Sequence, residues 1–406
     1  MVGRRINWLF VAGSIWRAPL WFAAAALLMA SGMAVGVAAQ SPTQAGVTAG
    51  VDQAEAPLQL LVDVDAGVDD ALALLWLLRQ QERPVELLGV VTVAGNASAA
   101  NATNNVLSLW EAAAVEGIPV VKGAEAPLIQ PLSRTGALLH GPDGLWRQGQ
   151  QPPYDQHDIP TDARSFYCTT LAASPGATLL ALGPLTNVAT ALEHCPDIMR
   201  TLDNVVILGG ARYGGNKTPV AEYNFWQDPE AAARVLGAGL SLSLVPLDAF
   251  TKSTFALTDL RALRRSTDPA LKLLVPALSL YAAAQIQFNG QAVLPDAVAA
   301  AVALEAAAAQ RQPALVRIVT EESLARGQSI IGLSDAERVA MLATDSQLSR
   351  LAVCALEPRS DPSCPRRINL QEAIDEILAG QPDNAQVVVQ IAPDLLIETI
   401  FAQLLE

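Results

Sequence analysis

The sequence predicts an α/β fold, an open and mainly parallel Rossmann-like sheet flanked by helices. Short apolar runs of strand length alternate along the chain with amphipathic helical patterns. The stretch LQLLV at 58–62 is apolar apart from Gln59, as in a strand that is covered on both faces. Polar residues gather directly after several runs, where ligands bind in such sheets. With 406 residues, 51% of them hydrophobic, the chain can bury a large core.

Six strand-like runs come in order along the chain. They are residues 58–64, 85–95, 118–121, 177–183, 204–210 and 240–247. Helical patterns follow four of them: DDALALLWLLRQQ, a long polar-apolar pattern ending near Glu111, PLTNVATALEHC and DPEAAARVLGAG. Later in the chain, ALVRIVT and AQVVVQIA predict further strands, and DLLIETIFAQLLE predicts a closing helix. This alternation favours parallel pairing with helical crossovers.

The first 39 residues are expected to be a secretory signal peptide that is removed on export. Arginines precede a long apolar run that ends in GVAAQ, with small residues at the cleavage positions. About 20 apolar residues can also span a bilayer, so an uncleaved membrane anchor is the alternative. Residues 40–56 are expected to form a flexible linker. Residues 57–406 are expected to form one domain, located in the periplasm, the cell envelope or the medium.

Charge and cysteine content narrow the range of partners. The chain has 26 basic and 40 acidic residues, a net charge of -14, which disfavours a nucleic-acid polymer. A small neutral substrate, or one approached through a cation, fits this composition better. The cysteines at 168, 195, 354 and 364 fit no zinc pattern. Cys354 and Cys364 flank a turn-rich loop that a disulfide could close in an exported protein, and free thiols are the alternative.

Four aspartates follow the first predicted strand, in the segment DVDAGVDD at 63–70. Asp69 and Asp70 could simply begin a helix, where carboxylates interact favourably with free N–H groups. Alternation along a strand would instead place Asp63 and Asp65 on one face, and the helix start would return the other two to the same strand end. Such close carboxylates repel unless a cation lies between them, and hard oxygen ligands suit Ca²⁺ or Mg²⁺.

A phosphatase of the haloacid dehalogenase type is a less favoured interpretation of the same segment. That family has an aspartate nucleophile and a second aspartate two residues later, a spacing that Asp63 and Asp65 match. It also has Thr or Ser two residues after the second aspartate, where this chain has Gly67.

Five motifs, taken in order, resemble the calcium-dependent nucleoside hydrolases of the inosine-uridine-preferring type. They are DVDAGVDDALAL, VAGN, LALGPLTNVATAL, LGGA…GGNKTPVAEYNFWQDPEAA and LARGQSIIGLSD. The similarity runs from about residue 58 to residue 335. The resemblance implies the nucleoside hydrolase fold, one Ca²⁺ at the base of a pocket, and hydrolysis of the N-glycosidic bond of ribonucleosides to base and ribose.

The resemblance also implies roles for residues at matching positions. Asp65, Asp70, Asp296 and the backbone carbonyl of Leu182 would hold the Ca²⁺, and Asp65 would take a proton from the calcium-bound water that attacks the ribose. Ribose contacts are implied for five residues: Asp69, Asn96, Asn216, Glu222 and Asn224. Asn216 and Asn224 could otherwise be ordinary turn residues. Members of the family are often homodimers or homotetramers.

One position departs from the family pattern. Inosine-uridine-type members carry His immediately before the third calcium aspartate, to help the base leave, and this chain has Pro295 there. His140, Trp226 and Tyr281 are candidates for contacts with the leaving base, as is Tyr213, and core packing is the alternative for the aromatic residues. The departure leaves open an exported nucleoside- or ribose-binding protein with weak or no turnover, and a structural paralogue without a ligand.

Overall fold

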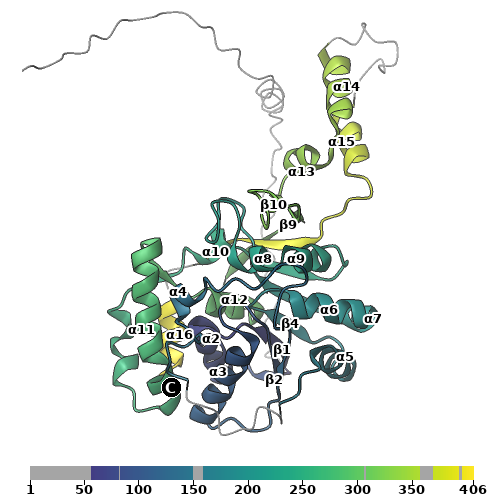
Figure 1. The fold of residues 1–406 in the computed structure, drawn as a ribbon. Coiled ribbons are helices and arrows are strands. Elements are labelled where there is room, and N and C mark those ends of the chain that lie inside the picture. The colour runs from purple at the N-terminus through teal and green to yellow at the C-terminus, as the bar shows by residue number, and fades with distance from the viewer. Residues whose placement is uncertain (1–55, 82, 150–158, 306–307, 357–368, 393–395) are drawn as a thin grey trace, which may run out of the picture. The chain divides into compact units, whose positions relative to one another are not determined.

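Figure 1 shows the computed structural model of the chain. The structure describes residues 56–81, 83–149, 159–305, 308–356, 369–392 and 396–406. The predicted signal peptide and Cys364 lie outside these ranges. The predicted linker also lies outside them, except for its last residue. The chain divides into a main unit, Ala54–Leu342 with Ile374–Glu406, and a second unit that includes Ala343–Ala373 and helix α14 (Asp345–Leu356). The main unit covers most of the predicted 57–406 domain, and Ala343–Ala373 is the part that groups separately.

A nine-stranded sheet forms the centre of the main unit, with the strand order β10-β9-β11-β6-β5-β4-β1-β2-β3. The pairs from β3 to β11 are parallel, and the pairs that β9 makes with β11 and β10 are antiparallel. The strands are β1 Leu58–Val64, β2 Val85–Thr92, β3 Val120–Lys122, β4 Thr178–Ala181, β5 Asn204–Leu208, β6 Leu242–Val245, β9 Ala309–Ile318, β10 Ser329–Gly332 and β11 Ala385–Ile391. The predicted α/β class, the six parallel strands and both later strands are confirmed. The short hairpin β7 (Thr254–Phe255) and β8 (Ala292–Val293) was not predicted.

The strand order changes direction at β1. The chain proceeds outward from β1 through β2 to β3, then returns to the other side of β1 and proceeds through β4, β5 and β6. The segments that follow β1 and β4 therefore leave the sheet toward opposite faces, so the ends of these two strands form a topological switch point. Ligands bind at such a switch point, beyond the carboxyl ends of the strands. Asp65 follows β1 and Leu182 follows β4, so both lie at this switch point.

Helices cover both faces of the sheet. One core contains Leu60, Val62 and Val64 of β1 together with residues of α2, α3, α11, α12 and α16. The other contains Leu61 together with residues of α5, α6 and α9. The helices of the main unit are α2 Val68–Leu78, α3 Ala99–Ala112, α4 Ala137–His140, α5 Ala163–Ala173, α6 Thr186–His194, α7 Pro196–Met199, α8 Tyr223–Gln227, α9 Pro229–Leu236, α10 Leu247–Phe250, α11 Pro269–Asn289, α12 Pro295–Ala303, α13 Asp335–Leu342 and the predicted closing helix α16 Leu396–Gln403. Helix α15, Leu370–Leu378, contains the boundary between the two units.

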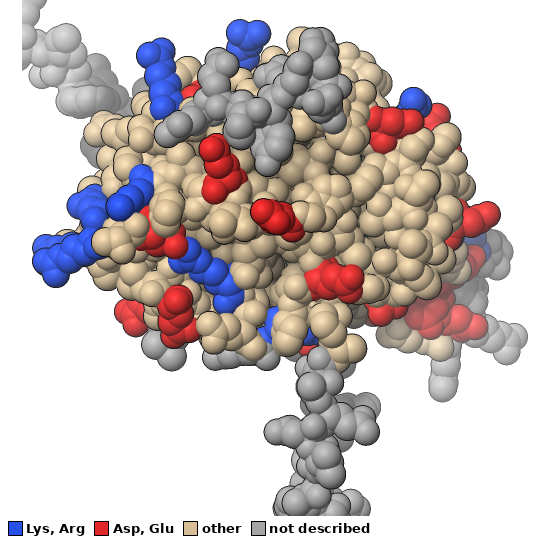
Figure 2. Space-filling model, turned by 90° about the horizontal axis from the view of Figure 1, so that it is seen from below, with Lys and Arg blue, Asp and Glu red and all other residues tan. Residues whose placement is uncertain are grey.

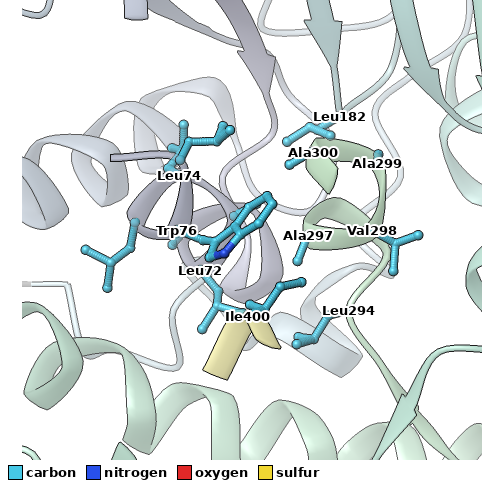
Figure 3. Packing of buried hydrophobic residues seen from close by; sticks show 14 of the residues in the cluster. Leu72, Leu74, Trp76, Leu182, Leu294, Ala297, Val298, Ala299, Ala300 and Ile400 are labelled. Atoms are coloured by element: carbon cyan, nitrogen blue, oxygen red, sulfur yellow. The ribbon is translucent and has the colours of Figure 1, made fainter. Parts of the chain in front are cut away.

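Helices α2 and α12 pack together below the switch point (Figure 3). The side chain of Trp76 on α2 lies beside an alanine-rich surface of α12 that includes Ala297 and Ala300, and Leu72 and Leu74 belong to the same core. Small side chains let two helices approach closely, and the buried apolar surface contributes about 25 cal/mol per Å². This packing matters for the site because both helices begin with aspartates, and it holds their N-termini at one place.

A disulfide joins Cys168 at α5 to Cys195 at the end of α6. The sequence suggested only the pair Cys354 and Cys364, so the pairing of the first two cysteines is a correction. Helices α5 and α6 pack side by side, and this contact brings together two cysteines that are 27 residues apart. Cys354 is also disulfide-bonded, and the suggested bridge to Cys364 involves a residue outside the described ranges.

Figure 2 shows one surface of the protein, on which Lys and Arg side chains stand among Asp and Glu side chains and much of the area is uncharged. The acidic excess in composition is therefore not gathered into a single acidic patch on this face.

Candidate active site

The segment after β1 turns sharply into α2 and carries the aspartates with it. Strand β1 ends at Val64, and Ala66 adopts a positive φ of 28°. A Cβ at residue 67 would lie 2.3 Å from His140 Nδ1, so the space beside His140 requires glycine there. This contact explains Gly67, the residue that departs from the phosphatase pattern. Helix α2 then begins at Val68 and places Asp69 and Asp70 in its first turn.

Three carboxylates meet at the N-termini of α2 and α12. Oxygens of Asp69, Asp70 and Asp296 lie within 4.8 Å of one another, and all three residues are buried. Oδ1 of Asp69 and Oδ1 of Asp70 have no hydrogen-bond partner in the described structure. Buried polar atoms are nearly always paired, because an unpaired one costs about 1–3 kcal/mol. Hard oxygen donors in this arrangement fit a divalent cation.

Asp65 borders this cluster and is held by Asn96. The backbone N–H of Asn96 donates to Asp65 Oδ2 at 2.6 Å, and its side-chain Nδ2 lies 3.1 Å from Asp65 Oδ1 and 3.3 Å from Asp70 Oδ2. A Cβ at Gly95 would lie 2.0 Å from Asp65 Oδ2, so the glycine of the VAGN motif provides the space for this carboxylate. The resemblance assigned Asp65, Asp70 and Asp296 to the cation, whereas the three carboxylates that lie within 4.8 Å of one another are those of Asp69, Asp70 and Asp296.

Asp63 does not belong to the cluster, which corrects the expected shared face with Asp65. Its side chain lies on the α5 and α6 side of the sheet, because residues alternate along β1 and Leu60, Val62 and Val64 occupy the other side. Tyr167 donates its hydroxyl to Asp63 Oδ2 at 2.6 Å, and Asn187 donates from Nδ2 at 2.8 Å. Burial raises the pKa of Asp63 to about 7 against the effect of these hydrogen bonds.

Burial without a counter-ion raises the pKa values of the clustered carboxyl groups. Burial and the charge of Asp70 raise the pKa of Asp65 well above its ordinary range. Burial and the charge of Asp69 raise the pKa of Asp70 to about 7, and the same two causes raise that of Asp296 well above its ordinary range. Without a cation the cluster therefore retains protons near neutral pH, and a bound cation would displace them.

The loop after β5 supplies a second group of polar residues. Glu222 is the N-cap of α8 and accepts hydrogen bonds from the backbone N–H groups of Gly210, Asn224 and Phe225. Burial raises the pKa of Glu222 to about 7, although these N–H groups lower it. Asn224 Nδ2 donates to the carbonyls of Leu182 at 2.7 Å and Leu208 at 3.1 Å. This amide therefore links the ends of β4 and β5 to the switch point.

Asn216 lies further out, on the exposed part of the same loop. Its Oδ1 accepts a hydrogen bond from the backbone N–H of Tyr223 at 2.9 Å. The hydroxyl of Tyr223 donates to the carbonyl of Gly95, next to Asn96. Sequence reasoning did not single out Tyr223, although it stands inside the motif AEYNFWQDPE. The structure thus connects Asn216 to the Asn96 side of the site through Tyr223.

His140 and Tyr281 both contact Asp69. His140 is buried, and its Nδ1 accepts a hydrogen bond from the backbone N–H of Val68 at 3.2 Å and lies 3.6 Å from Asp69 Oδ1. Burial lowers the pKa of His140, against the effect of Asp69. A neutral imidazole that accepts at Nδ1 carries its proton on Nε2. Tyr281 on α11 donates its hydroxyl to Asp69 Oδ2 at 2.6 Å, and its ring lies 5.0 Å from that of His140.

The two other aromatic candidates have different surroundings. Trp226 is half-buried, packs against Gly327, and has the ammonium of Lys217 4.2 Å from its ring centroid. Tyr213 is 70% exposed and pairs with the guanidinium of Arg212. The described contacts of Trp226 and Tyr213 therefore place neither at the aspartate cluster, whereas Tyr281 touches it directly.

Comparison with known proteins agrees with this fold. The model of the family described as inosine-uridine preferring nucleoside hydrolase matches residues 60–397. Uridine nucleosidase 1 of Arabidopsis thaliana is 34% identical over 57% of this chain and 69% of its own length. The non-specific ribonucleoside hydrolase RihC of Salmonella agona is 36% identical over 52% of this chain and 69% of its own length.

Solved structures extend the comparison to the whole fold. The plant nucleoside hydrolase PpNRh1 superposes with a TM-score of 0.70 at 25% identity, covering 86% of this chain and 99% of that one. A purine-preferring ribonucleoside hydrolase from Gardnerella vaginalis shares the fold, with a TM-score of 0.68 at 22% identity, covering 85% of this chain and 98% of that one. The chain belongs to the inosine-uridine preferring nucleoside hydrolase family. It is an enzyme of the nucleoside N-ribohydrolase class.

Proposed function

We propose that the protein hydrolyses the N-glycosidic bond of ribonucleosides, releasing free base and ribose, with one Ca²⁺ held at the switch point. The observation that carries this proposal is the buried group of Asp69, Asp70 and Asp296, with two unpaired carboxylate oxygens, bordered by Asp65. Four ligands are assigned to the cation: Asp65, Asp70, Asp296 and the carbonyl of Leu182. Asn224 donates to that carbonyl here, and a second lone pair remains available to it.

Ribose binding is assigned to the polar residues around the cation. Asp69 and Asn96 lie on the β1 and β2 side of the switch point, and Asn216, Glu222 and Asn224 lie on the β4 and β5 side. Together they present carboxylate acceptors and amide groups that both donate and accept, as a polyol requires. Tyr281 and Asn96 hold the carboxylates of Asp69 and Asp65 in fixed orientations, so little reorganisation is needed when a sugar binds.

The proposed reaction is attack of water on the anomeric carbon as the base departs. A bound Ca²⁺ would lower the pKa of the attacking water. Asp65 takes a proton from this water, and Asn96 holds its carboxylate through both oxygens. Positive charge develops on the ribose as the glycosidic bond breaks, and the surrounding carboxylates, including Glu222, stabilise it.

Departure of the base is the step for which this chain differs from the family pattern. Pro295 occupies N1 of α12 and carries no proton to donate. His140 is the first candidate for that role, because it is buried beside Asp69 and, as a neutral imidazole, carries a proton on Nε2. The absence of a donor at residue 295 also favours a second candidate function, an exported protein that binds nucleosides or ribose with little turnover.

An assay of purified protein for release of base and ribose from inosine and uridine tests the proposal. The protein is first freed of metal with a chelator, and Ca²⁺ is then added back while occupancy is measured by metal analysis. Replacing Asp70 with Asn should remove both calcium binding and turnover, whereas Asp197→Asn, at a carboxylate whose side chain is 97% exposed, should change neither. Calcium and ribose binding without base release would support the binding protein instead.

Export and self-association are proposed alongside the activity. The apolar segment within residues 1–39 supports export, and the disulfide between Cys168 and Cys195 is consistent with an oxidising compartment. Sequencing the N-terminus of protein from its native cells should find Gln40 or a near neighbour first. Full-length chain in the cytosol would contradict export, and full-length chain in the membrane would support the anchor. A homodimer or homotetramer is proposed, and sedimentation would distinguish these from a monomer.

A further inference from the structure

Two segments border the site on its solvent side. The His140 segment, residues 128–140, ends at His140, and the Asn216 loop, residues 209–222, carries Asn216 and Glu222. At its start the His140 segment is anchored by a hydrogen bond from the backbone N–H of Leu128 to Asp228, and by Gln130, which donates to backbone carbonyls of α8. At its end it is anchored by the contact between His140 and the start of α2.

The middle of the His140 segment is held by one residue of the Asn216 loop. Lys217 Nζ donates to Ser133 Oγ at 3.1 Å and to Thr135 Oγ1 at 2.5 Å. The other hydrogen bonds that the described structure gives to Ser133 and Thr135 stay within their own segment. Lys217 is thus the hydrogen-bonding link from Ser133 and Thr135 to the rest of the described protein, and the next residue, Gly136, donates its backbone N–H to the hydroxyl of Tyr223.

The environment of Lys217 is unusual for a lysine near the surface. Its ammonium lies 4.2 Å from the ring centroid of Trp226 and 5.9 Å from that of Tyr223, within cation–π range. The ion pairs formed by the described residues do not include Lys217. Partial burial lowers its pKa. The ammonium of Lys217 therefore loses part of its hydration, and its contacts with two hydroxyls and two aromatic rings compensate for this loss.

The position of the His140 segment matters because it packs directly on the ribose side of the site. A Cβ at Gly136 would lie 2.8 Å from the Cα of Asn96 and 3.0 Å from the hydroxyl of Tyr223. Asn96 in turn holds Asp65, and His140 at the end of the segment lies beside Asp69. If residues 133–135 moved away, the packing on Asn96 and the placement of His140 would loosen together.

We propose that Lys217 is a positioning residue, a clasp that joins the Asn216 loop to the His140 segment and keeps that segment packed on Asn96. Its effect on substrate affinity rests on the proposed function, whereas the clasp itself does not. Arginine should largely replace lysine, because a guanidinium can donate to both hydroxyls and stack on Trp226. Methionine has a similar length but neither donates nor carries charge.

Hydrogen exchange of residues 128–140, measured by mass spectrometry on the whole protein, tests the clasp. Exchange should be at least about tenfold faster in Lys217→Met, because both hydrogen bonds from the charged ammonium to the segment are lost. It should stay near wild type in Lys217→Arg and in the control Lys272→Met, which replaces an exposed lysine on α11. The double variant Ser133→Ala/Thr135→Val should exchange as fast as Lys217→Met, and combining all three changes should add little.

Kinetics then test the positioning role. Lys217→Met should lower kcat/KM for a ribonucleoside about tenfold. KM should rise because Asn96 is assigned to the ribose, and kcat should fall because Asp65 and His140 depend on the same packing. Exchange of residues 128–140 within twofold of wild type in Lys217→Met would overturn the clasp. Faster exchange with unchanged kcat/KM would overturn its role in positioning the site. If wild-type protein cleaves no riboside, the proposed function fails, and the exchange measurements still decide whether the clasp exists.

Discussion

Calcium should stabilise the protein far more at pH 8 than at pH 5, because of the carboxyl cluster. The perturbation is removal of metal with a chelator at each pH, followed by addition of Ca²⁺. The pKa of Asp70 is raised from 3.8 to about 7 in the folded protein without metal. Between these values the unfolded chain binds fewer protons than the folded one, so stability without metal falls as pH rises.

The size of the effect follows from Asp70 alone. A shift of about three pKa units corresponds to roughly 4 kcal/mol of lost stability once pH exceeds 7. A cation among the carboxylates offsets the burial and the repulsion that raise the pKa of Asp70. Free Ca²⁺ at about 1,000 times its Kd stabilises the folded protein by about 4 kcal/mol. For a domain of this size the gain in Tm is about 5 °C at pH 8. At pH 5 protons occupy the same oxygens, and the gain should be about 1 °C.

Differential scanning calorimetry with and without Ca²⁺ at pH 5, 6, 7 and 8 measures this directly. Asp70→Asn should abolish the dependence on calcium, and Asp197→Asn should preserve it. An equal rise in Tm at pH 5 and pH 8 would refute the reasoning, because calcium would then be binding where no proton competes. No rise at any pH, with less than about half occupancy by metal analysis, would remove Ca²⁺ from the proposed site.

Three further predictions concern the reaction and the fold. Asp65→Asn should abolish base release while the protein stays folded by circular dichroism, because it removes both a ligand charge and the base for water; unchanged turnover would mean that Asp65 has another role. A nitrophenyl riboside, whose leaving group hardly needs a proton, should be cleaved about 10²- to 10⁴-fold faster than inosine or uridine in kcat/KM, and Pro295→His should narrow that gap. Similar rates for all three substrates would indicate that another residue, first of all His140, already donates the proton. Reducing the Cys168–Cys195 disulfide, which closes a 27-residue separation, should lower the free energy of unfolding by about 3.5 kcal/mol in denaturant titrations; no change in the midpoint would contradict this.

Most strands were predictable from the sequence because each contains a short apolar run, and the runs of β1, β4, β5 and β6 are largely buried. Strand β10 was not predicted, because its apolar stretch in SIIG is only two residues long. The grouping of Asp63 with Asp65 was wrong because β1 ends at Val64, so the alternation of strand residues does not extend to Asp65, and the chain turns at Ala66. Cys168 and Cys195 could not be paired from spacing, since their approach depends on how α5 packs against α6. The contacts of Lys217 were unpredictable for the same reason, because its partners come from a distant loop.

The geometry of α12 explains how the chain can keep a cation site while lacking the usual histidine. Asp296 stands in the first turn of α12 as Asp69 and Asp70 stand in the first turn of α2, so two helix N-termini face the same carboxylates and offset part of their repulsion. Pro295 at N1 suits this arrangement, because the missing N–H would have no partner within the helix and the fixed φ favours helix initiation. Residue 295 can therefore change without disturbing Asp296. Cation binding and proton donation to the base are separable functions of adjacent residues, and the chain retains the residues for the first without the usual donor for the second. The kcat/KM of different ribonucleosides should therefore increase with the ease with which the base leaves without being protonated.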